Sequence, residues 1–262
     1  MDPEYYQEYF HNERSHWWFR AREAILCAQV ERLVARGRLP APARILNIGA
    51  ATGRSSEWLG QFGAVTSLEY DLDCCRMTRD KTGLEVIHGS ILDLPCDDVV
   101  FDLVCAFDVI EHVEDHETAV AEMRRVTRPD GVIFVTVPAY RWLWSEHDDI
   151  NHHCRRYSRR QLVSLFRSLP LCFVSGFNSL LLPPIALHRL LRKAAGILPV
   201  KRHRRRFDES LRSDFSRSRS SRWSPLLERI FRSERCWLDR GWPLPFGVSL
   251  MLVARNETAG GR

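Results

Sequence analysis

Short apolar segments alternate with amphipathic segments along most of the chain, and this alternation predicts the secondary structure. Runs rich in β-branched residues predict strands, and apolar residues spaced three and four apart predict helices. The predicted strands lie near residues 44–48, 64–69, 84–88, 100–106, 131–137, 171–178 and 246–254, and the predicted helices near 53–61, 73–80, 117–126 and 158–168. Strands that alternate with short helices indicate a doubly wound α/β fold with a mostly parallel sheet.

Two further segments interrupt or precede this pattern. Residues 1–40 are aromatic and helical in character, and they predict an amino-terminal helical cap or lid on a core of residues 41–178. Residues 179–245 predict a basic, partly apolar helical insertion, after which residues 246–262 supply the last strand and a tail. The apolar part of the insertion is too short and too broken by proline to span a membrane. Either an interfacial amphipathic helix or a lid over the substrate fits this pattern.

Composition and charge indicate in which cellular compartment the protein is expected. The 262 residues, 45% of them hydrophobic, can bury a full core. Eight cysteines occur without a Cys-x-x-Cys pair, which predicts a reducing cytoplasm with neither zinc nor disulfides. The first residues are acidic and no apolar signal segment follows them. The net charge of +5 gathers at Lys201–Arg206, which is either a solvated loop or part of a peripheral membrane contact through residues 179–222.

A glycine turn and an acidic residue indicate a nucleoside pocket. The apolar run that begins at residue 43 stops at Gly49, and Gly53 opens a predicted helix. Glu69 stands twenty positions beyond Gly49, at the end of the next apolar run. In an open parallel sheet, such an acid binds ribose hydroxyls at the carboxyl ends of the strands. A dinucleotide fingerprint would need glycine where Ala51 and Arg54 stand, so the spacing disfavours a pyrophosphate.

Four segments in the same order resemble class I S-adenosylmethionine-dependent methyltransferases of the type 11 domain family. They are the turn at residues 49–53, Glu69, residues 101–113 after the fourth predicted strand, and residues 128–138 at the fifth. The chain also resembles ubiquinone-type O-methyltransferases and a bacterial branch with an amino-terminal His-Trp-Trp-Phe-Arg motif, here residues 16–20. The resemblance implies a Rossmann-like sheet of seven strands, the last of them antiparallel, and S-adenosyl-L-methionine as cofactor.

The resemblance also implies which residues contact the cofactor. The implied set is Asn47, Gly49, Ala50, Ala51, Gly53, Glu69, Tyr70, Ser90, Ile91 and Asp108, with Arg20 or Arg22 at the cofactor carboxylate. Three positions depart from the family pattern. Asn47 and Ser90 stand where aspartate is usual, and Ala51 stands where glycine is usual. These changes predict weaker cofactor binding at an unchanged place.

A polar cluster follows the fourth predicted strand. Asp108, Glu111 and His112 offer two carboxylates and an imidazole, which are plausible ligands of a divalent cation. One short cluster supplies too few ligands for a closed site, so no metal is assigned. We interpret Glu111 and His112 as residues that orient the loop. His112 is also a candidate base for a substrate hydroxyl, since imidazole titrates near neutrality.

The segment after the fifth predicted strand should border the acceptor substrate, because it leaves the carboxyl edge of the sheet. Its His, Arg, Tyr and Trp side chains suit an acidic or hydroxylated, partly apolar acceptor. The bacterial branch has a similar pattern, and this implies catalytic roles for His147, His153 and Tyr157 beside His112, and acceptor-binding roles for Trp144 and Arg156. The alternative is that residues 155–160 begin the next helix with solvated charges.

The sequence therefore predicts an S-adenosylmethionine-dependent methyltransferase that methylates a small molecule, preferably on oxygen. Two alternatives stay open. The acceptor is a membrane lipid or polyprenyl-linked sugar that docks on the insertion, or the chain is an accessory protein that binds the cofactor without turnover. Nucleic acid is a disfavoured substrate, because no aromatic and basic interleaving marks a base-flipping platform. The sequence does not indicate an oligomeric state.

Overall fold

A seven-stranded sheet forms the centre of the molecule. The computed structural model describes residues 3–194 and 222–257. The strands are β1 (Ala43–Ile48), β2 (Gly63–Glu69), β3 (Val86–His88), β4 (Phe101–Phe107), β5 (Thr127–Pro138), β6 (Leu171–Phe177) and β7 (Ser249–Arg255). Their order in the sheet is β3-β2-β1-β4-β5-β7-β6, and β7 runs antiparallel to both of its neighbours while the other pairs are parallel. The predicted doubly wound fold with an antiparallel last strand is confirmed.

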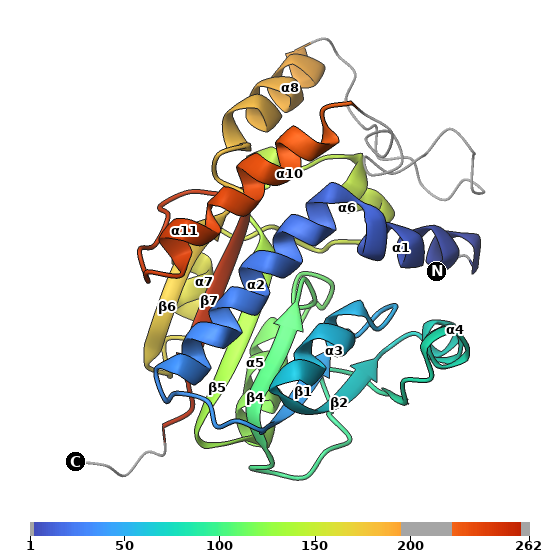
Figure 1. The fold of residues 1–262 in the computed structure, drawn as a ribbon, viewed down its shortest axis with the longest axis vertical. Coiled ribbons are helices and arrows are strands. Elements are labelled where there is room, and N and C mark those ends of the chain that lie inside the picture. Colours follow the sequence, from blue (N-terminus) through green and yellow to red (C-terminus); the bar gives the residue numbers. More distant parts are fainter. Residues whose placement is uncertain (1–2, 195–221, 258–262) are drawn as a thin grey trace.

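Helices cover both faces of this sheet (Figure 1). They are α1 (Pro3–Ser15), α2 (Trp17–Ala35), α3 (Arg54–Leu59), α4 (Leu72–Thr82), α5 (His116–Val126), α6 (Glu146–Ile150), α7 (Arg159–Leu165), α8 (Leu182–Ala194), α10 (Ser224–Ser233) and α11 (Arg235–Leu238). Two short 3-10 turns, η1 (Gly60–Phe62) and η2 (Arg141–Leu143), complete the described elements. Helices α2 and α10 lie on one face, and α5 lies on the other.

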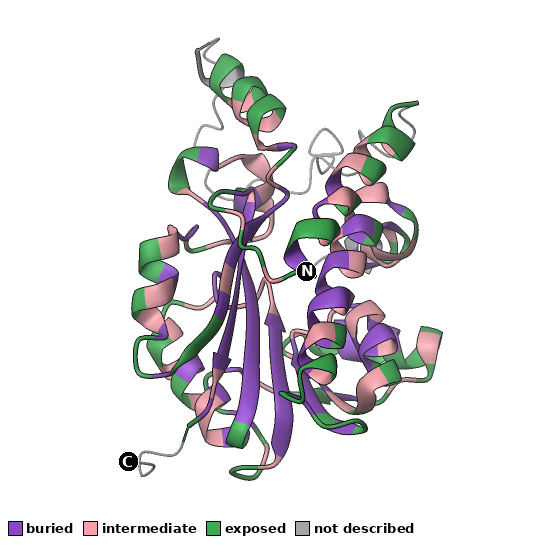
Figure 2. Ribbon diagram, turned by 60° about the vertical axis from the view of Figure 1, so that its left-hand side comes forward, coloured by how far each residue is buried: buried purple, intermediate pink, exposed green. Residues whose placement is uncertain are grey.

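Side chains of the central strands point alternately to the two faces of the sheet and belong to two separate hydrophobic cores. On β4, Val104 and Ala106 face the core shared with α5 and α7, whereas Leu103 and Cys105 face the core shared with α2. All four are fully buried, because helices cover both faces of a parallel sheet. The central strands accordingly are buried along most of their length in Figure 2. This explains why the predicted strands are continuous apolar runs rather than alternating ones.

The amino-terminal segment divides into a core helix and a helix at the cavity. Ile25, Leu26 and Val30 of α2 are buried against the sheet, so most of α2 is a layer of the core. Helix α1 instead reaches over the β1–α3 turn, where Arg14 donates to the Thr52 hydroxyl at 3.2 Å and pairs with Glu57. The lid expected over residues 1–40 therefore corresponds in position to α1 and the first turns of α2.

The insertion before β7 packs partly on the same core. Phe231 of α10 and Leu238 of α11 are fully buried beside α2. The Glu234 carboxylate accepts hydrogen bonds from the backbone amides of Ser179 and Leu180 at 2.6 and 2.7 Å, which ties α10 to the chain entering α8. The basic run expected at residues 201–206 lies outside the described residues. Within the described ranges, the helices are all too short or too polar to cross a membrane.

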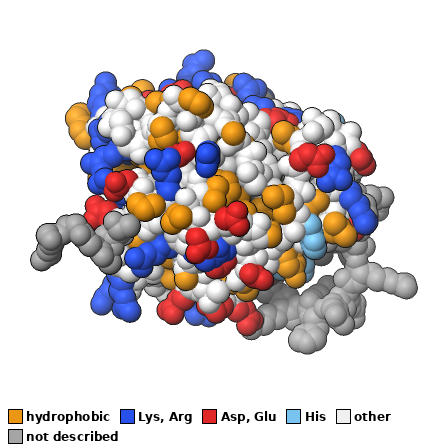
Figure 3. Space-filling view, turned by 90° about the horizontal axis from the view of Figure 1, so that it is seen from below, with side chains coloured by type: hydrophobic (Ala, Val, Ile, Leu, Met, Phe, Trp, Pro, Cys, Tyr) orange, Lys and Arg blue, Asp and Glu red, His pale blue; other side chains and the backbone are white. Residues whose placement is uncertain are grey.

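The end of the molecule that is lowest in Figure 1 has a mixed surface. Figure 3 views this end directly and shows acidic and basic side chains interspersed, with small apolar groups between them. A nucleic-acid backbone is attracted by a field of one sign. The described side chains on this face carry both signs of charge interspersed.

Candidate active site

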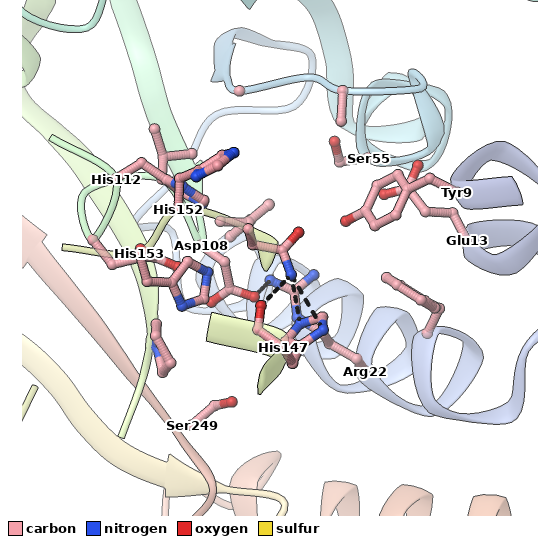
Figure 4. A pocket seen from close by; sticks show the side chains of 18 of the residues that line it. Tyr9, Glu13, Arg22, Ser55, Asp108, His112, His147, His152, His153 and Ser249 are labelled. Atoms are coloured by element: carbon pink, nitrogen blue, oxygen red, sulfur yellow. Dashed lines mark hydrogen bonds and ion pairs between the residues drawn. The ribbon is translucent and has the colours of Figure 1, made fainter. Parts of the chain in front are cut away.

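A cavity of about 1460 Å³ opens at the carboxyl ends of β1, β2 and β4. Figure 4 shows Tyr9, Glu13 and Ser55 on one side of it, His112, His152 and His153 on the other, and Asp108 between them. Doubly wound sheets bind their ligands at this edge, where the strand order reverses. The sequence predicted the site at this same edge.

The turn from β1 into α3 depends on left-handed backbone. Gly49, Ala51 and Gly53 have φ angles of 69°, 45° and 85°. A Cβ atom on Gly49 would lie 2.5 Å from Cγ2 of Val109, so glycine is also required there for space. Gly49 and Ala51 line the cavity, whereas Ala50 is buried behind it and Gly53 caps α3. Alanine at position 51 keeps the turn that the sequence predicted, in a conformation that glycine adopts more easily.

Asn47 points away from the cavity. Its Nδ2 donates to the hydroxyls of Ser55 and Ser56, both at 2.8 Å, and the residue is 1% exposed. Ser67 on β2 also bonds Ser56, with the two hydroxyl oxygens 2.7 Å apart. Asn47 therefore positions the first turn of α3, and Ser55 is the member of this network that lines the cavity.

The Glu69 carboxylate lies at the end of β2, beside the glycine turn. It accepts the backbone amides of Ala51 at 2.9 Å, Tyr70 at 2.9 Å and Asp71 at 3.0 Å. Burial raises the pKa of Glu69, and the three amides act in the opposite direction. Because a carboxylate has about four lone-pair directions, one side of Glu69 remains available to the cavity that it lines.

Three more predicted cofactor residues border the same half of the cavity. Tyr70 is 73% exposed, Ile91 is buried, and both line the cavity. Ser90 lines it too, while its hydroxyl accepts the amide of Leu92 at 3.1 Å. The structure thus brings these residues together with Glu69, as their order along the strands indicated.

Asp108 and Arg22 form an ion pair in the middle of the cavity wall. The Arg22 Nη2 lies 2.8 Å from Asp108 Oδ2 and also donates to the Thr136 hydroxyl at 3.0 Å. The Arg22 Nε is buried, and no described residue accepts its hydrogen bond. Arg20, the other arginine considered, instead pairs with Glu228 at 3.1 Å and does not line the cavity. Arg22 is therefore the guanidinium at this wall.

Asp148 organises the histidine side of the cavity, and sequence reasoning gave it no role. This fully buried carboxylate accepts hydrogen bonds from His153 Nδ1 at 2.9 Å, Arg156 Nε at 2.6 Å and the Ser145 amide at 2.8 Å. Burial opposes ionisation of Asp148, but the His153 bond and the Arg156 charge outweigh it and hold its pKa well below the usual range. Arg156 and His153 both line the cavity, and each is fixed through Asp148.

Glu111 and His112 face the cavity from the loop after β4. Burial is the main cause that raises the pKa of Glu111 well above its usual value, and the Asp108 charge adds to it. Burial, followed by the neighbouring His153, lowers the pKa of His112 to about 4. His112 is accordingly neutral at physiological pH. His147 also lines this side, with Asn151 Nδ2 3.2 Å from each of its ring nitrogens.

Two residues expected on the acceptor side lie elsewhere. Tyr157 is 2% exposed and belongs to the core; its hydroxyl is 2.7 Å from His116 Nδ1 and donates to the Ile110 carbonyl at 3.2 Å. Trp144 donates from Nε1 to Asp149 at 3.0 Å. Neither of them lines the cavity. The motif could not show which way each side chain points.

Comparison with known proteins agrees with this geometry. Residues 46–135 match the family model described as a methyltransferase domain. The chain is 30% identical over 124 residues to a probable S-adenosylmethionine-dependent methyltransferase of Mycolicibacterium smegmatis, covering 47% of this chain and 46% of the relative. It is also 30% identical over 100 residues to a demethylmenaquinone methyltransferase of Staphylococcus epidermidis, covering 34% and 42% of the two chains. The chain thus spans less than half the length of these curated relatives.

Solved structures extend the likeness to almost the whole fold. A methyltransferase from Archaeoglobus fulgidus, described as dependent on S-adenosylmethionine, superposes with a TM-score of 0.53 at 13% identity, covering 95% of this chain and 99% of that one. The [4+2]-cyclase SpnF superposes with a TM-score of 0.56 at 18% identity, covering 94% and 84%. Because a cyclase shares the architecture, the reaction has to be argued from the residues of the site.

Proposed function

We propose that this chain, in which residues 46–135 form a methyltransferase domain of the S-adenosylmethionine-dependent class, methylates a hydroxyl of a small molecule with S-adenosylmethionine as cofactor. The observation that carries the proposal is the Glu69 carboxylate, which lines the cavity next to the glycine turn. An acid at this place accepts hydrogen bonds from ribose hydroxyls. Each such charge-assisted bond contributes about 1.5–3 kcal/mol.

The residues around the cavity fit the other end of the cofactor as well. The buried Arg22 Nε needs an acceptor, and the carboxylate of the cofactor supplies one. Asp108 holds the guanidinium in place from the opposite side. Arg22 thereby takes the role for which Arg20 was also considered.

The chemistry needs alignment more than activation. When bound, S-adenosylmethionine supplies a methyl group that is attached to a positively charged sulfur. After the methyl group is transferred, the sulfur remains as a neutral thioether, which is a good leaving group. Holding the acceptor oxygen in line with that bond can lower the barrier by about 7–11 kcal/mol. Trp17, Trp18 and Phe107 line the cavity and exclude water from it. His147, on the acceptor side, accepts the hydroxyl proton as the oxygen attacks.

Binding of the demethylated product, S-adenosylhomocysteine, tests the cofactor half of this proposal. Titration calorimetry on the full chain should show one saturable site. The free energy of unfolding should rise by about 2.7 kcal/mol at a hundredfold excess over Kd. Glu69→Gln should weaken binding by at least about tenfold, since one charge-assisted bond exceeds 1.4 kcal/mol. The exposed Asp73→Asn is the matched control. Unchanged affinity in Glu69→Gln would refute the assignment.

Methyl transfer tests the acceptor half. The full chain and cofactor labelled on the methyl group should transfer label to hydroxylated aromatic or aliphatic compounds in preference to the matching amines. Saturable cofactor binding with no transfer to any member of such a panel would instead favour the accessory-protein alternative. Preferential labelling of amines would contradict O-methylation.

A second candidate acceptor is a molecule carried by a membrane, which would place the protein at the cytoplasmic surface of that membrane. Helix α8 supplies the observation. Its residues Leu187, Leu190 and Leu191 are 59%, 53% and 60% exposed, while Ile185 and His188 line the cavity. Helix α8, at the top of Figure 1, therefore both borders the cavity and carries three exposed leucines. Interfacial helices bury such stripes in the headgroup region.

Vesicle flotation separates the two acceptors. The full chain should float with anionic phosphatidylserine vesicles if the acceptor is membrane-borne, and the triple variant Leu187→Ser, Leu190→Ser, Leu191→Ser should not. Leu226→Ser on α10 is a control that removes one exposed leucine elsewhere. No flotation of the unmodified chain would leave the soluble acceptor as the remaining candidate.

A further inference from the structure

We propose that Glu13 of helix α1 binds the α-ammonium group of the cofactor, while Arg22 of α2 binds the α-carboxylate beside it. This inference rests on the proposed function, because it concerns how the amino-acid end of S-adenosylmethionine is held. That end carries one charge of each sign, and charged hydrogen-bond partners bind such groups most strongly. Glu13 and Arg22 both line the cavity, and Figure 4 shows them extending from the two amino-terminal helices.

The end of β1 supplies no carboxylate to this part of the cavity. Asn47 stands there in place of the aspartate that is usual in the family pattern. Its side chain is neutral, and its Nδ2 is bonded to the hydroxyls of Ser55 and Ser56. An acid that faces the ammonium group therefore has to come from another element.

The other acids on the cofactor half of the cavity already have partners. Glu69 accepts three backbone amides at the position assigned to the ribose. Asp71 accepts two backbone amides at the start of α4, and Asp108 is paired with Arg22. Among the described acids that line this half, Glu13 is thus the one left for the amino-acid end.

The Glu13 carboxylate lies beside the turn between β1 and α3. Its Oε2 accepts a hydrogen bond from the hydroxyl of Thr52, which belongs to that turn. Arg14, the next residue of α1, is paired with Glu57 instead. In the part of the chain that the structure describes, no basic side chain pairs with Glu13 and no donor bonds its Oε1. This oxygen is therefore available to a donor on the ligand.

The electrostatic setting of Glu13 favours a cationic ligand. Burial raises the pKa of Glu13 to about 7, and the charge of Glu57 adds to the rise. The Thr52 bond and the charges of Arg14 and Arg22 oppose it. A positive charge within hydrogen-bond distance stabilises the ionised form of a carboxyl group. Binding of the ammonium group would therefore complete the ionisation of Glu13, which is only partial near neutral pH.

The arrangement makes the amino-terminal segment responsible for recognising the amino-acid end. Glu13 and Arg22 lie on consecutive helices, and only His16 separates α1 from α2. A ligand that carries both charges would bind to both helices at once. A ligand that lacks the amino group would lose its contact with α1. Glu13 is accordingly a residue that determines specificity for the complete cofactor.

Titration calorimetry with two ligands tests the assignment. They are S-adenosylhomocysteine and its deaminated analogue, in which hydrogen replaces the α-amino group. The full chain should bind S-adenosylhomocysteine at least about tenfold more tightly than the analogue. Glu13→Gln should reduce this preference to within about threefold by weakening S-adenosylhomocysteine alone. Glu8→Gln is the matched control, since Glu8 is on the same helix but does not line the cavity, and it should keep the preference.

A pH series on the unmodified chain gives a second readout that needs no substitution. The preference for S-adenosylhomocysteine should fall by about fivefold from pH 8 to pH 6, because Glu13 takes up a proton. The amino group of the ligand stays protonated over this range. Both ligands share the adenosine and the carboxylate, so groups that titrate near those parts affect both affinities alike.

Each outcome bears on the proposal. Equal weakening of both ligands by Glu13→Gln would overturn it, because Glu13 would then only hold the turn through Thr52. An undiminished preference in the variant would also overturn it. If the variant loses its cooperative melting transition, the pH series decides, and a preference that is constant with pH counts against Glu13. Tight binding of S-adenosylhomocysteine without preference over the analogue would defeat this inference alone, whereas binding of neither ligand would defeat the proposed function as well.

Discussion

Helical spacing separates Arg20 from Arg22, although only one residue stands between them. Positions two apart on a helix point in directions that differ by about 200°. Arg22 precedes Ile25 and Leu26 by three and four residues and shares their buried side, and Arg20 is 56% exposed. The fold therefore assigns one arginine to the cavity and the other to a surface ion pair.

Replacement of these two arginines gives a matched prediction. Arg22→Gln should weaken S-adenosylhomocysteine binding by about tenfold or more, because it removes a charge-assisted bond to the cofactor carboxylate. Arg20→Gln should leave Kd within about twofold, because an exposed ion pair contributes little. Calorimetric titration measures both. Equal effects of the two substitutions would contradict the role of Arg22.

The site residues that could be predicted from the sequence are those fixed by local backbone. Gly49 and Glu69 follow from a turn and a strand end, and both line the cavity. Tyr157 and Asp148 could not be assigned this way, because their environments depend on segments distant in the chain. Tyr157 meets Ile110 in the core, and Asp148 joins His153 to Arg156. Arg22 could have been preferred over Arg20 from the sequence, because Arg22 lies three and four residues before the apolar Ile25 and Leu26 and therefore on the same side of the helix.

At the scale of an element, the β1–α3 turn requires glycine at its first position, Gly49. Gly49 accepts its left-handed conformation at no steric cost, and the Val109 side chain fills the space that a Cβ would take. The amides of Gly49 and Ala50 both bond the Leu68 carbonyl, at 2.8 and 3.0 Å, which holds the turn against β2. The turn, Val109 and β2 thus form one unit.

Gly49→Ala should therefore destabilise the protein by about 1–3 kcal/mol and weaken cofactor binding. Gly37→Ala is the matched control, because Gly37 has φ of 64° and a Cβ atom added there would meet nothing within 4 Å. In a Val109→Ala background, the cost of Gly49→Ala should fall to that of Gly37→Ala. Chemical denaturation measures all four variants. An undiminished cost in the Val109→Ala background would show that the collision with Val109 is not the cause.

A second prediction at the scale of an element concerns Glu234, whose titration makes the stability of the fold depend on pH. Burial raises the pKa of this carboxyl to about 7, and amide hydrogen bonds at the start of the insertion oppose the rise only partly. A folded-state pKa above the unfolded value means that folding binds a proton. The resulting contribution to stability is complete below the unfolded pKa, which is near 4.3, and is lost as pH rises through about 7.

Glu234→Gln should accordingly gain stability relative to the unmodified chain as pH increases. Between about pH 5 and pH 8, the difference in unfolding free energy should change by up to about 3 kcal/mol in favour of the variant. Glu31→Gln is the control, an exposed carboxylate paired with Arg235 at 2.8 Å. Denaturant titrations over this pH range measure the difference. A difference that does not vary with pH would refute the assignment.

At the scale of the whole molecule, the cavity joins parts that are far apart in the chain. Tyr6 of α1, Glu69 of β2, His153 after α6 and Ile185 of α8 all line it. The doubly wound sheet was predicted from the alternation of apolar and amphipathic segments, and the antiparallel direction of β7 from the resemblance to known methyltransferases. How α2, α10 and α11 share one core did not follow, since side-chain contacts between distant helices leave no local pattern.

Hydrogen exchange should show that segments distant in the chain respond together to a ligand in the cavity. Binding of S-adenosylhomocysteine should slow amide exchange at residues 6–22 as well as at residues 49–71, because both ranges border the cofactor half. Helix α7, which does not line the cavity, should exchange at an unchanged rate. Mass spectrometry with and without the ligand measures the effect. Protection restricted to residues 49–71 would mean that α1 and the start of α2 do not close over the cofactor.

The position of β7 also has a consequence for how the protein is made. Besides β4, the only described strand that pairs with β5 is β7, and β6 pairs with β7 alone among the described strands. A ribosome therefore releases β5 and β6 well before their common neighbour emerges. Until then, the nascent chain presents the open sheet edge of β5 and an unpaired β6, a form prone to aggregation. Chaperone dependence during synthesis should thus fall only once residues 249–255 have left the exit tunnel.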